Sequence, residues 1–403
     1  MKIQVLRLIT LVSIFLSGLW SVAAFGAPAQ GAPIVIGVLE DRSSTGAFFS
    51  QESTKALRVF VDAVNNGELL YANQMFKGVP GIMGRPIKLL FEDDQSNPNL
   101  SIAKARRLVE QGAQMLYFLS GSSATIQGRV VCTELKIFCI APTNVNSQIV
   151  QPPNNEFIFT VSPPSAITAR TIVDAWKTSG YRRVGYFSES TGTSKPVLDS
   201  FVKTLSEAGF ETAAIEIMEA GARDASPQLL RLMESKPDVL LDLTNHAPST
   251  VTLFRSYKRL NLKIPRWSGV GITIQPQVWA ESGDGIDGLI VVDLVSPAKP
   301  ELVDVRKLYS SSVVGKDQPL TWGHATVWDA LMLTKFAVEK AGSTDGTAVV
   351  ANMEKVSNFS VAHGQAGYTL SFNGKHNGSG QKAANIVVFD KGKPARLWEG
   401  YQP

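Results

Sequence analysis

Short apolar segments alternate with helix-length segments along almost the whole chain. Strands separated by single helices form βαβ units, and the strands of such units pair in a parallel sheet. The alternation comes in two runs, which are separated by Val161-Ser162-Pro163-Pro164. The sequence therefore predicts an α/β protein with two doubly wound lobes. The expected strands are 34–39, 87–91, 115–119, 137–140, 184–187, 213–217 and 239–243, and the expected helices lie near 52–66, 99–112, 124–135, 194–209, 226–236 and 248–261.

The chain is expected to pass between the two lobes three times. The first crossing follows the Pro163-Pro164 break, and a second break, at 296–300, follows an expected strand at 288–295. A helix at about 324–341 comes next, and the chain then ends in a hairpin pattern with a strand at 385–389. Three crossings would form a hinge. We assign residues 33–160 and 292–352 to an N-terminal lobe, and residues 161–291 and 353–403 to a C-terminal lobe.

The N-terminus has the pattern of a secretory signal peptide. Lys2 and Arg7 precede an uncharged run of eighteen mostly apolar residues, and small residues follow it. We expect residues 1–29 to be the signal peptide, with cleavage after Gly26 or Ala29. The alternative is an uncleaved anchor, because eighteen such residues are just enough to span a bilayer. No later segment has such a run, so we expect the mature protein to be soluble.

The charge balance argues against a nucleic-acid partner. The full chain carries a net charge of +4, which falls to +2 when Lys2 and Arg7 leave with the signal peptide. A protein that binds nucleic acid usually carries a basic stripe on one face. We therefore expect a small molecule as the ligand, and neither DNA nor RNA.

The cysteines and histidines do not form a metal-binding pattern. Cys132 is expected near a helix end and Cys139 in the next strand, so the two could form a disulfide in an oxidising compartment. The alternative is a pair of small buried apolar side chains. The histidines are far apart in the sequence, without the spacing of metal ligands, and we expect no metal site. They are His246, His324, His363 and His376.

The chain lacks the common sequence motifs of catalysis and cofactor binding. Gly121-Ser122-Ser123-Ala124 does not complete the Gly-x-Ser-x-Gly turn of serine hydrolases. Gly269-Val270-Gly271 lacks the third glycine of a dinucleotide fingerprint, and no phosphate-binding Gly-Lys-Ser/Thr sequence is present. We therefore expect no enzyme activity and no cofactor.

Polar residues follow the expected strands where a ligand would be bound. The stretch Gly84 to Pro98 reads as a tight turn, a buried strand and an acidic loop, and small ligands bind at the carboxyl ends of strands in open α/β sheets. Ser122 and Ser123 follow the next strand and begin a helix, where hydroxyl and backbone N–H groups suit a carboxylate. The alternative is that these serines only cap the helix.

Several motifs in a fixed order resemble the extracellular solute-binding proteins of the branched-chain amino-acid class, which serve ABC importers. The motifs are Ile36-Gly37-Val38, Thr45-Gly46, Ala63-Val64-Asn65, Gly84 to Pro98, Ser120-Gly121-Ser122-Ser123, Ile140-Ala141-Pro142-Thr143, Leu370-Ser371-Phe372 and Asn377-Gly378. The resemblance implies a type I periplasmic binding protein, in which two Rossmann-like lobes joined by three hinge strands close on a ligand. It further implies a monomer in the periplasm that delivers its ligand to an ABC permease in the inner membrane.

The resemblance also implies a set of ligand-binding residues and shows where this chain differs. Thr143 and Asn144 stand where relatives offer backbone and hydroxyl contacts, although ordinary turn chemistry explains them equally well. Val270 stands where amino-acid binders of this class have the acidic residue that pairs with the ligand ammonium. Thr191 replaces the usual tyrosine before Gly192, and His246 replaces an aromatic residue. Either of these two side chains could instead face solvent.

The expected ligand is an aromatic or other apolar organic acid. A buried ammonium group without a carboxylate partner is costly, so Val270 disfavours an α-amino acid. Phe48 and Phe49 follow the first strand, and one of them could stack on a planar ligand or pack beneath the loop. Two alternatives stay open: a protein that binds branched-chain or other amino acids, and a periplasmic ligand sensor that presents its ligand to a receptor.

Overall fold

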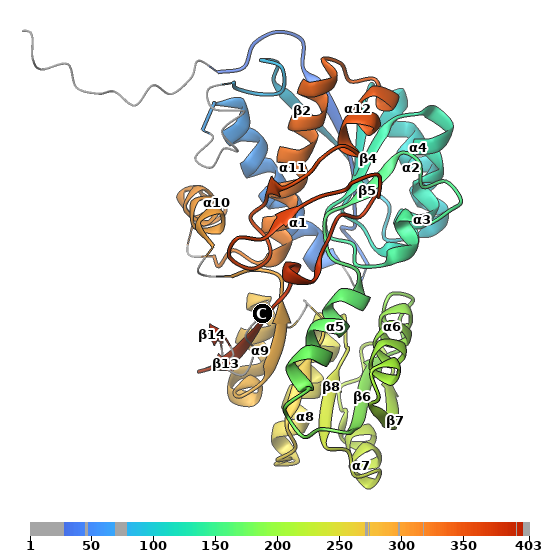
Figure 1. Cartoon of the computed structure of the whole chain (residues 1–403), viewed down its shortest axis with the longest axis vertical. Coiled ribbons are helices and arrows are strands. Elements are labelled where there is room, and N and C mark those ends of the chain that lie inside the picture. The colour runs from blue at the N-terminus through green and yellow to red at the C-terminus, as the bar shows by residue number, and fades with distance from the viewer. Residues whose placement is uncertain are drawn as a thin grey trace, which may run out of the picture.

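The computed structural model divides the chain into two α/β lobes, which lie one above the other in Figure 1. It describes residues 28–44, 47–68, 79–270, 273, 275–296, 299–316 and 318–391, and the backbone of 393–397. The expected signal peptide therefore lies outside the described residues, apart from its last two positions. Within the described part, no helix combines the length and the apolar character needed to cross a membrane.

The N-terminal lobe is built on a five-stranded, all-parallel sheet with the order β2-β1-β3-β4-β5. Its strands are β1 (Ile34–Glu40), β2 (Ile87–Asp93), β3 (Met115–Phe118), β4 (Phe138–Ala141) and β5 (Ile158–Thr160). Its helices include α1 (Ala47–Asn65), α2 (Pro98–Glu110), α3 (Ser122–Gly128) and α4 (Val130–Leu135), with a 3₁₀ turn η2 (Ser147–Val150).

Both faces of this sheet are covered, and the strand sequences explain why. Side chains along a strand alternate between its two faces. In β3, Met115 and Tyr117 belong to one apolar cluster, whereas Leu116 and Phe118 belong to the other. Strands buried on both faces read as continuous apolar runs, which is the pattern seen in the sequence.

The C-terminal lobe contains a seven-stranded sheet with the order β14-β13-β10-β9-β8-β6-β7. It is parallel from β10 to β7, and the last two strands of the chain add antiparallel to its edge. Its strands are β6 (Arg183–Glu189), β7 (Glu211–Met218), β8 (Val239–Asp242), β9 (Arg266–Ser268), β10 (Ile290–Asp293), β13 (Asn385–Asp390) and β14 (Lys393–Leu397). Its helices are α5 (Ser165–Trp176), α6 (Ser194–Glu207), α7 (Ser226–Glu234), α8 (Ala247–Arg259) and α9 (Pro276–Ser282), with 3₁₀ turns η4 (Gly283–Ile286) and η5 (Gln381–Ala383). The predicted fold class, two α/β lobes with parallel sheets, is confirmed.

After β10 the chain returns to the first lobe, where α11 packs against α1. This returning part contains α10 (Pro300–Ser311), α11 (Trp322–Ala341), α12 (Gly346–Met353), β11 (Phe359–Ser360) and β12 (Thr369–Leu370). The chain thus passes between the sheets after β5, after β10 and before β13, which are three crossings in all.

The predicted boundaries of the lobes need two corrections. Residues 353–403 were assigned to the C-terminal lobe, but the Phe372 ring lies 5.1 Å from the Phe159 ring of the first lobe, measured between centroids. His376 also stacks on Phe159, with centroids 4.1 Å apart, so the chain reaches the second lobe only shortly before β13. The assignment of residue 292 onward to the first lobe also begins too early, because Val292 pairs within β10 of the second sheet.

Cys132 and Cys139 form a disulfide that ties α4 to β4, with their Cα atoms 6.2 Å apart. Both residues are fully buried. The structure therefore has the bridge, which was one of the two alternatives left open by the sequence. The bridge closes a short loop within the first lobe.

Asp242 is a buried acid at the carboxyl end of β8. Its Oδ1 accepts hydrogen bonds from the backbone N–H and the hydroxyl of Thr244, at 2.8 and 2.6 Å. Burial raises the pKa of Asp242 to about 7 despite these bonds, and the neighbouring Glu189 carboxylate adds to the shift. The folded state therefore holds a proton on Asp242 at a pH where the unfolded chain has lost it.

We expect the double variant Cys132→Ala/Cys139→Ala to be less stable by about 2–3 kcal/mol, because opening a short cross-linked loop releases entropy in the unfolded chain. Urea denaturation of the oxidised wild type and the variant measures this difference in the free energy of unfolding. Adding a reductant should destabilise the wild type and leave the variant unchanged. Equal stability of the two proteins under oxidising conditions would contradict the prediction.

We expect Asp242→Asn to gain stability relative to the wild type as the pH rises. A raised pKa in the folded state gives stability that is present at low pH and lost as the pH rises toward the folded pKa. The Asn Oδ1 can keep both bonds from Thr244 but never ionises. Between pH 4 and pH 8, the difference in unfolding free energy should shift toward the variant by about 2–4 kcal/mol. Urea melts across this pH range test it, and a difference that does not change with pH would refute it.

Candidate functional site

A cavity of about 550 Å³ lies between the two lobes. Its walls come from the loops that follow β1, β2, β3 and β4 in the first lobe and β6, β8 and β9 in the second. The carboxyl ends of both parallel sheets thus face one cavity, as expected for ligand sites in open α/β sheets. The volume falls within the range of about 300–1,000 Å³ that is typical of small-molecule sites.

The structure brings together all the residues predicted for the site except Phe48. The residues that line the cavity are Phe49, Ser122, Ser123, Thr143, Asn144, Thr191, His246 and Val270. Phe48 lies in the first turn of α1 and is not part of the cavity wall. Of the two phenylalanines expected near the ligand, only Phe49 lies in the cavity wall.

Asn144 holds the serine loop of the first-lobe wall in place. The Ser122 hydroxyl donates to Asn144 Oδ1 at 2.8 Å, and Asn144 Nδ2 donates to the Ser120 carbonyl at 3.3 Å. Asn144 is 6% exposed, and both ends of its side-chain amide are engaged in these hydrogen bonds. Ser123 is exposed in the cleft, and no hydrogen bond among the described residues occupies its hydroxyl or that of Thr143. The donors that remain for a ligand on this wall include these two hydroxyls and the backbone N–H groups that begin α3.

Two acidic residues of the first lobe support the wall, and both are held by hydrogen bonds. Asp94 lies behind it, where its Oδ2 accepts from the Ser120 hydroxyl at 2.8 Å. Burial raises the pKa of Asp94 to about 6. Asp41 lines the cavity, and its carboxylate accepts from the Ser44 backbone N–H at 2.9 Å and from the Ser96 hydroxyl at 2.8 Å. The acidic stretch seen in the sequence therefore positions the loops through Asp94.

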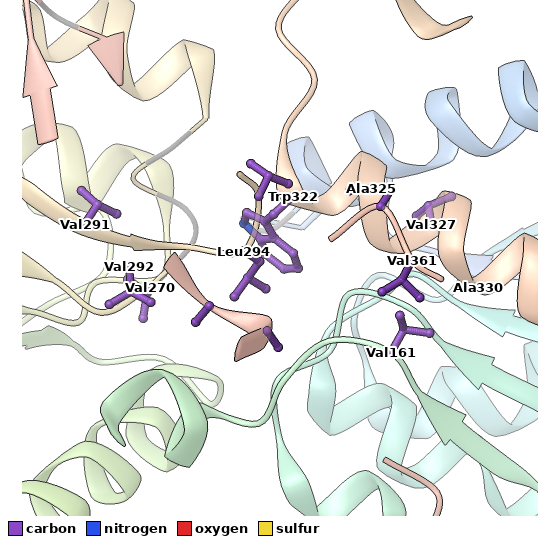
Figure 2. Close-up of a cluster of buried hydrophobic side chains, with 14 of the residues drawn as sticks. Val161, Val270, Val291, Val292, Leu294, Trp322, Ala325, Val327, Ala330 and Val361 are labelled. Carbon is purple, nitrogen blue, oxygen red and sulfur yellow. The ribbon is translucent and has the colours of Figure 1, made fainter. Parts of the chain in front are cut away.

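An aromatic pair forms the apolar wall of the first lobe. Phe49 packs against Trp322, with ring centroids 5.0 Å apart and planes inclined by 32°. Trp322 begins α11 and also lines the cavity, as do Leu294 and Val292 near the second crossing. Figure 2 shows these three residues with Val270 in one apolar cluster. Sequence reasoning missed Trp322, because it lies far along the chain from every motif that marked the site.

The second-lobe wall combines the apolar side chains of Val270 and Val292 with polar groups, and it contains a carboxylate that sequence reasoning also missed. Glu189 ends β6, lines the cavity and is only 3% exposed. Its Oε1 accepts from the Ser194 hydroxyl at 2.9 Å and from the Asn245 backbone N–H at 2.8 Å. Thr191 in turn donates to Ser194 Oγ at 2.7 Å. The signal that could have identified Glu189 is its position two residues after the expected strand 184–187.

The two walls approach each other closely. A Cβ atom placed on Gly192 of the second lobe would lie 3.8 Å from Ser123 Oγ of the first, which is ordinary van der Waals contact. His246 lines the cavity directly before α8, with Nδ1 3.5 Å from Ser249 Oγ. A ligand in the cavity would therefore touch both lobes at once.

The cavity wall carries negative but no permanent positive side chains. Asp41 and Glu189 line it, and the lining residues in the described part of the chain include neither lysine nor arginine. Among those same residues, no group of three or more histidine, cysteine, aspartate or glutamate side chains is arranged to hold a metal ion. The site is thus suited to a small organic molecule held by hydrogen bonds and apolar contacts.

Comparisons with known proteins agree with this geometry. The sequence model of the periplasmic binding protein family matches residues 33–393. The Leu/Ile/Val-binding protein BraC3 of Rhizobium johnstonii is 22% identical over 333 residues, which cover 82% of this chain and 85% of that protein.

Solved structures share the fold at low sequence identity. The branched-chain amino-acid binding protein LivJ of Streptococcus pneumoniae, in complex with isoleucine, superposes with a TM-score of 0.76 at 15% identity, over 91% of this chain and 98% of that one. A solute-binding protein of an ABC transporter from Rhodopseudomonas palustris, in complex with benzoate, gives a TM-score of 0.73 at 19% identity, over 92% and 99% of the two chains. With a family match that spans both lobes and the cavity between them, the chain belongs to the periplasmic binding protein family, as a non-enzymatic type I member of the branched-chain amino-acid class.

Proposed function

We propose that this protein is the solute-binding component of an ABC importer and captures a small organic carboxylate, with an aromatic or apolar acid favoured over an α-amino acid. The composition of the cavity wall is the observation that supports this class of ligand. Hydroxyl and backbone N–H donors gather on the first lobe, and Val270 stands, 6% exposed, where the resemblance places an acidic partner for an ammonium group.

The polar end of the ligand is assigned to the first lobe. Ser123 and Thr143 offer hydroxyl groups, and the start of α3 adds backbone N–H groups that have no partner within the helix. Charge-assisted hydrogen bonds of this kind are stronger than neutral ones, so they can hold a carboxylate without a cation. Ser122 contributes by fixing the loop through Asn144.

The apolar body of the ligand is assigned to the aromatic wall. Phe49 and Trp322 supply aromatic rings to this wall, and Val270, Val292 and Leu294 complete an apolar surface. The benzoate complex of the R. palustris structure is consistent with an aromatic acid in this fold. The names of the curated relatives, such as the Leu/Ile/Val-binding protein BraC3, favour a branched-chain amino acid as the second candidate.

The hinge between the two lobes explains how the ligand is captured. The ligand first contacts Ser123 and Thr143, and the second lobe then closes over it with Thr191 and His246. Closure excludes water and lowers the local dielectric constant, which strengthens each polar contact inside. The closed form is the one that an inner-membrane permease would recognise, and residues 1–29 would direct the chain to the periplasm.

We expect the mature protein, from about residue 30, to be stabilised by aromatic carboxylates and not by leucine, isoleucine or valine. A ligand at a hundred times its dissociation constant adds about 2.7 kcal/mol, which raises the melting temperature by several degrees. A thermal-shift screen with aromatic and aliphatic acids, amides and amino acids measures this. Shifts with branched-chain amino acids alone would replace the aromatic-acid assignment by the second candidate.

We expect Ser122→Ala/Ser123→Ala to weaken binding of the best carboxylate by about 10–100-fold, because hydrogen bonds to a charged group contribute about 1.5–3 kcal/mol. Calorimetric titration gives the dissociation constants. Ser206→Ala, an exposed position on α6 away from the cavity, is the matched control and should bind like the wild type. Unchanged affinity in the double variant would show that the carboxylate is held elsewhere.

A further inference from the structure

Glu189 has a half-satisfied carboxylate in the wall of the cavity. Its Oε1 accepts two hydrogen bonds, from Ser194 and from the Asn245 backbone. Its Oε2 is buried and has no hydrogen-bond partner in the part of the chain that the structure describes. The side chain as a whole is 97% buried, so bulk water does not replace the missing partner.

A buried polar atom without a partner is costly, and more so when it is charged. Native proteins pair nearly all such atoms, so this exception calls for a donor, which is either the proton that burial leaves on the neighbouring Asp242 or a group of a ligand in the cavity. The partner must donate a hydrogen bond, because an ionised carboxylate only accepts. Among the described residues that line the cavity there is no lysine or arginine to supply it.

The orientation of Glu189 is fixed from the opposite side. Ser194 begins α6 and Asn245 precedes α8, so two separate loops hold Oε1. Thr191 holds Ser194 in turn, through its hydroxyl and through a bond from the Ser194 backbone N–H at 3.1 Å. A carboxylate that is held in this way can discriminate between ligands, because its side chain loses little conformational entropy when a donor binds to it.

We propose that Glu189 determines ligand specificity by selecting acids that carry a hydrogen-bond donor, such as a hydroxyl or amino group, in addition to the carboxylate. This inference rests on the proposed function, since it concerns the same cavity and the same ligand. It narrows the ligand class from apolar acids in general to those that also carry a hydroxyl group or an amino group away from the α-position. A site built to pair a polar group rejects an analogue that lacks the group, because its own polar atom is then left unpaired.

The test uses matched ligand pairs that differ by one donor. The pairs are benzoate with 3- and 4-hydroxybenzoate, 3-phenylpropanoate with 3-(4-hydroxyphenyl)propanoate, and 4-methylpentanoate with leucine. Calorimetric titration of the mature full chain gives a dissociation constant for each. We expect at least one donor-bearing acid to bind about 10–100-fold more tightly than its donor-free partner, which corresponds to about 1.5–3 kcal/mol for a bond to a charged acceptor.

The variant Glu189→Gln tests the residue itself. Its Oε1 can keep the bonds from Ser194 and Asn245, while its amide group replaces an acceptor by a donor. The preference for the donor-bearing member of the pair should fall to less than about threefold. Glu207→Gln, the same change at an exposed position of α6, is the control and should keep the preference. The wild-type comparison stands by itself should Glu189→Gln not fold.

Each outcome supports or overturns the role of Glu189, the proposed function, or both. A Glu189-dependent preference for a hydroxy acid supports both. A Glu189-dependent preference for leucine alone supports the role of Glu189 and overturns the preference for acids that are not amino acids. Equal binding within every pair, or a preference that survives in Glu189→Gln, overturns the role of Glu189 and leaves the proposed function standing. Binding of none of these acids overturns both.

Discussion

Both walls of the cavity depend on one constraint, which is that a parallel sheet places all its strand-to-helix loops at the same edge. Asp41 follows β1, Ser122 follows β3 and Thr143 follows β4, so three separate stretches of the first lobe meet without any contact that is local in sequence. In the second lobe the same rule brings Glu189, at the end of β6, and His246, after β8, to the same cavity. The three crossings of the chain then turn these two edges toward each other.

The charge on the walls limits how an anion can be held. Asp41 and Glu189 are both acidic, and no lysine or arginine of the described chain offsets them at the cavity surface. Asp41 is surrounded by donors from its own loop and from Ser96, so its charge is spread over several hydrogen bonds. A ligand carboxylate would therefore depend on the hydroxyl and backbone dipoles of Ser123 and Thr143, whose effect is strongest when the lobes exclude water.

The sequence was sufficient to predict features that are local along the chain. Apolar runs identified most strands, and the positions after them identified Ser122, Thr143 and Thr191 as residues near the cavity. The return of the chain to the first lobe was predicted for residues 292–352, which include Trp322, but that assignment does not show that the Trp322 ring packs on Phe49 in the cavity wall. The assignment was wrong for the segment around Phe372, which also packs against the first lobe, and no periodicity in the sequence carries that information. Glu189 was missed for another reason, because the sequence does not show which partners the oxygens of a carboxylate at the end of a strand will have in the folded protein.

In the proposal for Glu189, its Oε2 atom links the closure of the two lobes to the recognition of the ligand. Gly192 lies within van der Waals reach of Ser123, so the lobes can approach closely only if the groups between them are paired or apolar. In a closed cavity without a ligand, Glu189 Oε2 would be unpaired at a cost of about 1–3 kcal/mol or more, which favours an open form in which water reaches it. A ligand with a donor removes that cost only in the closed form, and a ligand shifts a conformational equilibrium only by its difference in affinity for the two states. On this proposal, Glu189 makes closing conditional on the ligand that the cavity is built to accept.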